Sequence, residues 1–170
     1  MVKYTPTLGL LIALLIFIAD QVTKYIVSGP LQLQSVGNIE ILPFFDLTWV
    51  ENRGISLGLF TADNDAARWV LVAVTAIIAA AVAYWMTREP RRGDQIALGA
   101  VLGGALGNIV DRSRFGYVVD FADLHIGTFR PFLVFNVADA SISLGVVALI
   151  LRAFLIKDPV VAEAKATQGE

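Results

Sequence analysis

The chain has 170 residues, of which 56% are hydrophobic and only 16% are charged, with a formal net charge of −2. A soluble domain carries about 25% charged residues, so the apolar excess, with a mean hydropathy of +0.69, predicts an integral membrane protein. The slightly acidic balance argues against a nucleic-acid-binding protein, the lack of cysteine excludes disulfides and thiolate sites, and the one histidine, His125, excludes a two-histidine metal motif.

The first predicted membrane span covers residues 4–27. A span takes about 20 residues of helix, whereas the apolar region of a cleaved signal peptide has about 7–15. No A-x-A-like cleavage site follows the apolar run, and Asp20 and Lys24 continue the helical pattern. The sequence therefore favours a retained span over a signal peptide.

The connection that follows, residues 29–68, has the pattern of a small β-rich unit. Three short segments in it alternate in polarity or are rich in strand-forming residues: residues 31–34, 39–42 and 47–50. Gly37 and Pro43 punctuate these segments, as expected of turns. We therefore expect an all-α membrane protein with a small β-rich unit between its first and second spans.

Three further apolar stretches complete a set of four predicted spans: residues 69–87, 95–110 and 132–151. Trp69 and Trp85, near the ends of the second span, suit membrane interfaces, and the fourth span carries one charge, Asp139, near its start. We treat residues 1–158 as a single membrane domain. Residues 159–170 are predicted to be a disordered tail on the cytoplasmic side.

The third span carries a stripe of glycines. Gly99, Gly103 and Gly107 form two successive G-x-x-x-G steps, and Gly104 is predicted to extend that face. Small residues at this spacing let helices approach closely in a membrane. We therefore interpret the stripe as a helix-packing surface and not as a ligand site.

Lysine and arginine are denser on one side of the predicted bundle. The short connection over residues 88–92 carries three arginines, and Lys3 and the cations near the C-terminus lie on the same side. Because cytoplasmic loops carry the excess of these residues, both termini are predicted to be cytoplasmic. The β-rich unit and the connection between the third and fourth spans are then extracytoplasmic.

The polar side chains at membrane depth are predicted to gather at one level, near the outer ends of the helices. They come from the first span, the third span, the connection after it and the start of the fourth span: Asp20, Lys24, Asn108, Asp111, Arg112, Asp120, Asn136 and Asp139. Burying ionisable groups in a membrane is costly, so such residues are functional candidates by default. The clustering indicates a site near the outer face.

Each of these residues also has a structural interpretation. Asp20 and Lys24 are spaced as an i,i+4 ion pair on one helix. Asn136 and Asp139 have the pattern of a helix N-cap followed by an acid in the first turn. Arg112 also fits an interfacial anchor. The sequence alone leaves these alternatives open.

Asp120 and Asp139 are harder to explain separately. Asp120 ends a strand-like run, Asp139 opens a helix, and both are predicted to lie at the outer surface. Two aspartates a few ångströms apart share one proton, which leaves one as a general base and the other as a general acid. Such a pair activates water without metal, Ser, Cys or His, and we hypothesise that these two residues form it.

These residues carry a resemblance to lipoprotein signal peptidase, also called signal peptidase II. Five segments match the family's motifs in order: residues 20–24 (DQVTK), 51–54 (ENRG) followed by Phe60, 103–112 (GGALGNIVDR), 118–121 (VVDF) and 135–139 (FNVAD). The match runs from about residue 8 to residue 155. Two departures are Ile55-Ser56 after Gly54, where small residues are common, and the 123–133 loop, which does not align closely.

The resemblance implies four transmembrane helices with an extracytoplasmic β-cradle, in the cytoplasmic (inner) membrane of a bacterium. It places Asp120 and Asp139 in the catalytic positions and Asp20 and Lys24 in a supporting polar pair. The positions that line or shape the substrate site fall on Asn52, Gly54, Asn108, Arg112 and Asn136.

The substrate implied by the resemblance is a prolipoprotein whose lipobox cysteine carries diacylglycerol, with cleavage just before that cysteine. The family is a target of the cyclic peptide globomycin. We expect an aspartic endopeptidase that works in contact with membrane lipid as a monomer, without metal or other cofactor and without a nucleic-acid partner.

Two alternatives come from other classes of mechanism. A small proton-coupled transporter or channel subunit would also carry intramembrane acids, but here the acids gather at one level and the second and third spans have none in their interiors. A Ser–Lys peptidase would use Lys24 and Ser28, whose helical spacing is more often coincidence. His125 is expected to be a solvated loop residue and not a ligand.

Overall fold

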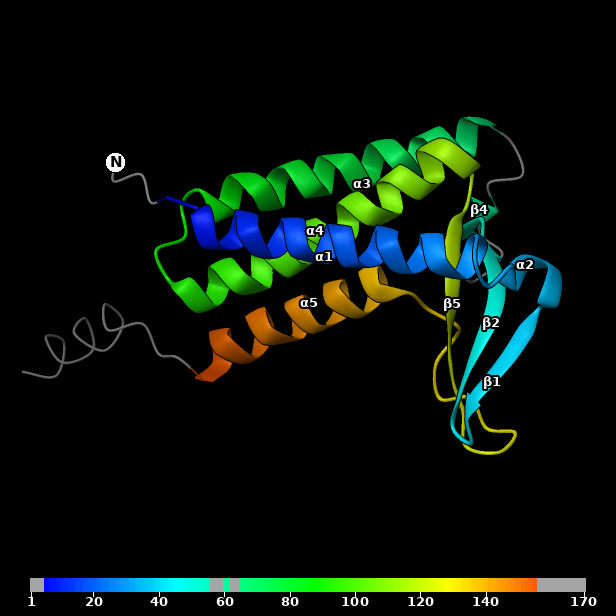
Figure 1. Ribbon diagram of the computed structural model, residues 1–170. Coiled ribbons are helices and arrows are strands. Elements are labelled where there is room, and N and C mark those ends of the chain that lie inside the picture. The colour runs from blue at the N-terminus through cyan, green and yellow to red at the C-terminus, as the bar shows by residue number, and fades with distance from the viewer. Residues whose placement is uncertain (1–4, 56–59, 62–64, 156–170) are drawn as a thin grey trace, which may run out of the picture.

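The computed structural model describes residues 5–55, 60–61 and 65–155. Four long helices lie side by side: α1 (Thr7–Ser28), α3 (Asp65–Met86), α4 (Arg92–Phe115) and α5 (Val137–Leu155) (Figure 1). Each is long and apolar enough to cross a membrane, so the four predicted apolar helices are confirmed. The predicted tail and the departure at Ser56 lie outside the described residues.

The helix bounds differ from the apolar runs in two ways: polar turns extend α4 at both ends, and α5 begins later than its apolar run. α4 begins before residue 95 and runs on through Asp111 and Arg112 to Phe115. α5 begins at Val137 and not at residue 132, because the chain before it pairs with a strand. Hydropathy finds the apolar part of a helix, so it misses polar end turns.

α4 is the central helix, and it packs against α1, α3 and α5. A Cβ added at Gly99 or Gly103 would overlap the α1 backbone at Gly9 or Ala13, which confirms the predicted packing role of these glycines. The prediction that Gly104 lies on the same face is wrong, because Gly104 meets α5 at the Ala138 carbonyl. The glycines of α4 therefore serve two neighbouring helices, one on each side.

A three-stranded antiparallel sheet lies across one end of the bundle (Figure 1). Its strands are β1 (Asn38–Leu42), β2 (Phe45–Asn52) and β5 (Val118–Leu124), in that order. The first two come from the connection after α1, but β5 comes from the connection between α4 and α5. We expected the β-rich unit to come from the connection after α1 alone. It is instead built from two connections.

A two-stranded sheet and a short helix complete the described part of the chain. β3 (Gly54–Ile55) pairs with β4 (Phe60–Thr61). The prediction of a strand over residues 31–34 is wrong: α2 (Leu33–Val36) is a short helix there. Gln32 has a φ of 45°, in the left-handed region, so the chain turns at this point and cannot stay extended. Leu33 is fully buried in the core beneath the sheet.

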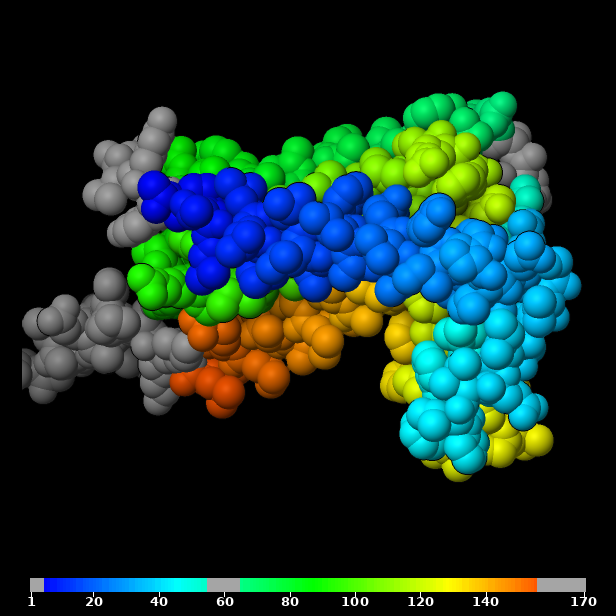
Figure 2. Space-filling model, viewed as in Figure 1, coloured from blue at the N-terminus to red at the C-terminus, as the bar shows by residue number. Residues whose placement is uncertain are grey.

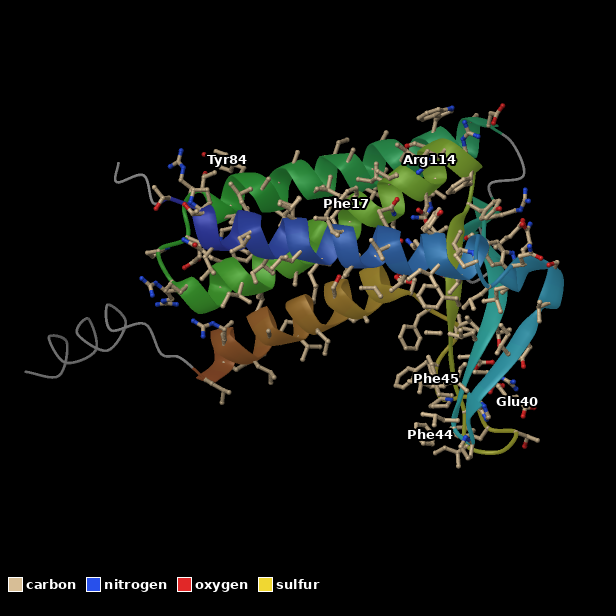
Figure 3. All side chains as sticks on the ribbon, in the orientation of Figure 1. Phe17, Glu40, Phe44, Phe45, Tyr84 and Arg114 are labelled. Atoms are coloured by element: carbon tan, nitrogen blue, oxygen red, sulfur yellow. The ribbon has the colours of Figure 1, made fainter. Side chains whose placement is uncertain are left out.

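The sheet and the described ends of the chain lie at opposite ends of the bundle. Thr7 at the start of α1 and Leu155 at the end of α5 are both far from the sheet (Figure 1). The sheet projects sideways past α5, and a hollow separates the two in the space-filling view (Figure 2). At the far end of the sheet, Phe44 and Phe45 lie toward the α5 side, whereas Glu40 points away (Figure 3).

Candidate active site

The polar residues singled out from the sequence meet where the sheet joins the helices. α1, α4, β2, β5 and the first turn of α5 each contribute side chains to one hydrogen-bonded cluster. Those that the structure brings together are Asp20, Lys24, Asn52, Asn108, Asp111, Asp120, Asn136 and Asp139. The predicted convergence at one level of the bundle is therefore observed.

The sequence pattern indicated that Asp120 ends a strand. In the structure it lies within β5, which continues to Leu124. Its side chain is almost fully buried, with a residue exposure of 2%. Asn52 Nδ2 donates to Oδ2 at 3.0 Å, and Asn136 Nδ2 donates to Oδ1 at 2.6 Å. Two neutral amides therefore hold both oxygens of this carboxyl group.

Asn52 reaches Asp120 because β2 pairs with β5 antiparallel. Val50 lies opposite Asp120 and Asn52 lies opposite Val118, so Asn52 is one alternation beyond the aspartate on the neighbouring strand. The backbone N–H of Gly54 donates to Asn52 Oδ1 at 3.2 Å, which orients the amide. Gly54 thus contacts the candidate site through its backbone.

Asp139 lies in the first turn of α5 and is half-buried. Its Oδ1 accepts a hydrogen bond from Asn108 Nδ2 at 2.9 Å. Its backbone N–H donates to Asn136 Oδ1 at 2.8 Å, which is the geometry of a helix N-cap. The same Asn136 donates to Asp120 through Nδ2, so the capping and the site interpretations both describe this residue.

The environment of Asp120 favours its protonated form. Burial and, to a lesser extent, the negative charge of Asp139 raise the pKa of Asp120 from 3.8 to a net value of about 7. The amides of Asn52 and Asn136 act in the opposite sense, because they stabilise the ionised carboxylate. Asp120 can therefore hold a proton near neutral pH.

Arg112 lies on α4 beside the two aspartates and is partly buried. Its guanidinium interacts electrostatically with the carboxylates of Asp139, Asp120 and Asp111. Its Nε atom is buried and has no hydrogen-bond partner among the described residues. Leaving a buried donor without a hydrogen bond costs free energy. Arg112 is therefore suited to donate a hydrogen bond to an oxygen of a bound molecule.

Lys24 lies between two buried carboxylates. Its Nζ is 2.9 Å from Asp20 Oδ2 and 2.8 Å from Asp111 Oδ2, and it donates to Asn108 Oδ1 at 3.2 Å. The sequence predicted the pair of Asp20 and Lys24 but treated Asp111 only as one more acid in the cluster. The spacing of Asp111 could have indicated this contact, because Asn108 and Asp111 are three residues apart and share a helix face.

A second polar cluster lies farther along the sheet, and the sequence did not predict it. Asp46 on β2 is the direct cross-strand partner of Asp123 on β5. Arg130 Nε donates to both oxygens of Asp123 at 3.1 Å, and Thr48 Oγ1 donates to Oδ2 at 3.1 Å. His125 Nε2 lies 3.3 Å from Asp46, so its expected position in solvent is wrong.

An apolar groove runs from the candidate site along α5. It has a volume of about 340 Å³ and is lined by Leu124, Phe132, Leu133, Phe135, Asp139, Ala140, Ser143 and Leu144. A larger hollow of about 470 Å³ lies at the opposite end of the bundle, near Thr7 and Gln95, away from the carboxylates. The groove is the one that matters here, because it opens beside Asp139.

A metal-binding arrangement does not appear in the part of the chain that the structure describes. No group of three or more His, Cys, Asp or Glu side chains there is placed to hold a metal ion. The carboxylates of the site are instead bound by amides and by Lys24. The chemistry that this arrangement supports is proton exchange between Asp120 and Asp139.

Comparisons with known proteins agree on one family. The family model described as signal peptidase (SPase) II matches residues 12–155. A protein of Sphingopyxis alaskensis named lipoprotein signal peptidase is 64% identical over 148 residues, covering 87% of this chain and 86% of that protein. One of the same name from Rhizorhabdus wittichii is 55% identical, covering 89% of this chain and 88% of that protein.

A solved structure described as a bacterial membrane enzyme has a similar fold. It superimposes with a TM-score of 0.76 at 33% sequence identity, covering 92% of this chain and 97% of the solved chain. A second structure with the same description gives a TM-score of 0.75, also at 33% identity, and covers 89% and 90%. The arrangement of helices and sheet is therefore shared with solved membrane enzymes.

Proposed function

The chain belongs to the signal peptidase II family, and from this premise we propose that Asp120 and Asp139 are its catalytic pair. It is a peptidase that removes the signal peptide from prolipoproteins, and its four apolar helices fit a multi-pass protein of the inner membrane. The observation that carries the proposal is the junction at Asn136, which donates to Asp120 and accepts from the backbone of Asp139.

The pair would work as a general base and a general acid that share one proton. The ionised carboxylate takes a proton from water as the water oxygen bonds to the scissile carbonyl carbon. The protonated carboxyl group donates its proton to the carbonyl oxygen, which gives a tetrahedral intermediate. When the intermediate collapses, the C–N bond breaks and the carboxyl group that took the water proton gives it to the leaving nitrogen. The other carboxylate takes back the proton from a hydroxyl of the intermediate, so the pair returns to its starting state.

The amide residues supply fixed positions for this exchange. Asn52 and Asn136 hold Asp120, and Asn108 holds Asp139. Arg112 presents the buried Nε described above, and we assign it to an oxygen of the bound substrate. Gly54 acts through the hydrogen bond that orients Asn52.

The groove along α5 supports a substrate that is anchored in lipid. Cleavage just before a diacylglyceryl cysteine places the scissile bond next to a residue whose acyl chains lie in the membrane. The groove joins Asp139 to exposed apolar residues of α5 such as Leu144, so such a residue can reach the pair without leaving the lipid. The enzyme would work as a monomer and without a cofactor.

We further propose that both termini are cytoplasmic and that the sheet and the catalytic pair lie at the outer face. The concentration of arginine in residues 88–92 supports this orientation. A tag inserted at Asn64 should then be accessible in intact spheroplasts, and a reporter fused after Lys157 should behave as cytoplasmic. Protection of the Asn64 tag would overturn the orientation.

The experiment that tests the function combines two assays on the purified protein in lipid vesicles. With a diacylglyceryl prolipoprotein, the expected result is a mobility shift to the mature form that resists chelators and serine- or thiol-directed reagents. With a pH gradient and no substrate, no proton flux is expected. Flux without cleavage would favour the alternative, a proton-coupled transporter or channel subunit.

A further inference from the structure

The residue immediately before each catalytic aspartate is held by a buried carboxylate. The backbone N–H of Val119, which precedes Asp120, donates to Asp111 Oδ2 at 3.1 Å. The backbone N–H of Ala138, which precedes Asp139, donates to Asp20 Oδ1 at 3.0 Å. All four of these groups are buried, so both bonds are shielded from water.

One lysine joins the two carboxylates. Lys24 Nζ lies within 2.9 Å of Asp20 and 2.8 Å of Asp111. The Gln21 amide also connects them, because its Nε2 donates to Asp111 Oδ1 and to Asp20 Oδ2, each at 3.1 Å. The two anchors are therefore parts of one unit on α1 and α4, although the aspartates they serve lie on β5 and α5.

The unit also reaches the side chain of Asp139 through one intervening residue, Asn108. Lys24 Nζ donates to Asn108 Oδ1 at 3.2 Å, which turns the amide of Asn108 so that its Nδ2 donates to Asp139 at 2.9 Å. An asparagine with a freely rotating amide would present either atom to Asp139. The cation thus fixes which end of the amide faces the catalytic carboxylate.

The packing is tight where Asp20 of this unit meets α4. A Cβ at Gly107 on α4 would overlap Asp20 Oδ2, so the glycine at this position makes space for a carboxylate and not only for a neighbouring helix. Gly99 and Gly103, on the same face of α4, meet backbone atoms of α1 instead. The glycine stripe therefore has a distinct role at its end nearest the site.

We propose that Asp20, Lys24 and Asp111 form a positioning unit that sets the spacing of the catalytic pair by holding the backbone before each aspartate. The inference rests on the proposed function, since it takes Asp120 and Asp139 as the catalytic residues. A pair that shares a proton works only at a short, fixed separation. Backbone bonds of Phe135 to Phe121 and Ala122 join the start of α5 to β5, and the two carboxylate anchors add a fixed point directly beside each aspartate. A buried ion pair kept only for stability has no need of these two backbone bonds.

The test separates positioning from stability with matched aspartate variants of α4. Asp111→Leu removes the acceptor of the Val119 N–H, and Asp111→Asn keeps an oxygen there but loses the charge. Asp94→Asn is the control, because Asp94 is also a buried aspartate of α4, paired with Arg152 at the opposite end of the bundle. For each variant, kcat and KM for a diacylglyceryl prolipoprotein are measured per folded enzyme in lipid.

We expect Asp111→Leu to lower kcat by about 100-fold with an unchanged KM, because a shift of about 1 Å far from the chemistry costs that much. Asp111→Asn should lower kcat by about tenfold, since a neutral acceptor makes a weaker hydrogen bond than a carboxylate. Asp94→Asn should lower the unfolding temperature and leave kcat unchanged. Hydrogen exchange should rise at Val119 in the Asp111 variants and at Ala138 in Asp20→Asn.

The outcomes are decisive even if one variant does not fold. If Asp111→Leu fails to fold, Asp111→Asn and Asp20→Asn carry the test. If these variants behave like Asp94→Asn, with fewer folded molecules but the parental kcat, the positioning role is wrong. Asp139→Asn is assayed in parallel: if it cleaves substrate, the catalytic pair itself is wrong, and if it is inactive while the Asp111 and Asp20 variants are not, only the positioning unit fails.

Discussion

Asp120 and Asp123 lie three residues apart on β5 and are both almost fully buried, with exposures of 2% and 1%, yet they have different kinds of partner. Asp120 accepts hydrogen bonds from the amides of Asn52 and Asn136. Asp123 accepts from the guanidinium of Arg130 and the hydroxyl of Thr48. Each also has a second aspartate near it, Asp139 in the first case and Asp46 in the second.

The difference in partners distinguishes the carboxyl group that we propose as catalytic from the other buried aspartate on the same strand. A cation held against a carboxylate stabilises the ionised form, whereas burial and a neighbouring negative charge favour the protonated form. Asp123 is therefore suited to hold the sheet to the 123–133 loop through Arg130. Asp120 is suited to exchange a proton with Asp139, because its pKa is raised to about 7.

The largest expected effect contrasts these two aspartates directly. Asp120→Asn should abolish detectable cleavage, a loss of at least about 1000-fold, because the pair can no longer exchange a proton. Asp123→Asn should keep measurable turnover, since its side chain contacts Arg130 and Thr48 and not the pair. The measurement is a prolipoprotein gel-shift time course at equal concentrations of folded enzyme. Equal loss of turnover in both variants would contradict separate roles for Asp120 and Asp123.

Removing the cation from the second cluster should change stability and not chemistry. Arg130→Met leaves Asp123 buried with Thr48 as its remaining donor. Because the Arg130 side chain is half exposed and solvent weakens such a pair, we expect a loss of about 1–2 kcal/mol in the free energy of unfolding. Denaturation in detergent measures it. A large fall in kcat would instead tie Arg130 to the catalytic site.

The smallest expected effect is a change with pH that depends on Asp120. Because its pKa in the folded protein lies above that of the unfolded chain, the folded state binds the extra proton, and this contribution to stability is lost as pH rises from about 4 through about 7. Cleavage should also decline above about pH 7, as the pair loses its shared proton. The pH profile of kcat/KM measures this, and Asp123→Asn is the control. A flat profile above pH 7 would contradict proton sharing.

The helices and the level of the site were predictable because both depend on local composition. Apolar runs of membrane length define the four spans, and ionisable residues within them mark where the bundle is not lipid-facing. The i,i+4 spacing of Asp20 and Lys24 indicated that they form an ion pair. Asn136 likewise showed the pattern of a helix cap before its second contact, with Asp120, was known.

The parts that were not predictable depend on pairing between distant segments. Nothing local indicates that β5 joins strands from the connection after α1, so the partnership of Asp46 with Asp123 and the contact of His125 with Asp46 were missed. The segment at residues 31–34 alternated like a strand, but four residues do not distinguish a strand from the turn of helix found there. The hydrogen bond from the Val119 backbone on β5 to Asp111 was likewise not predictable, because it joins two different elements.

The central claim is that Asp120 and Asp139 act as one unit, and a double-mutant cycle tests it most directly. Cleavage of a diacylglyceryl prolipoprotein is measured for Asp120→Asn, Asp139→Asn and the double variant, each folded and inserted in lipid. Residues that act as a unit are strongly non-additive, so the double variant should be scarcely slower than either single one. Robust cleavage by Asp139→Asn, or losses that multiply in the double variant, would contradict the account and leave Asp139 as a helix-start acid only.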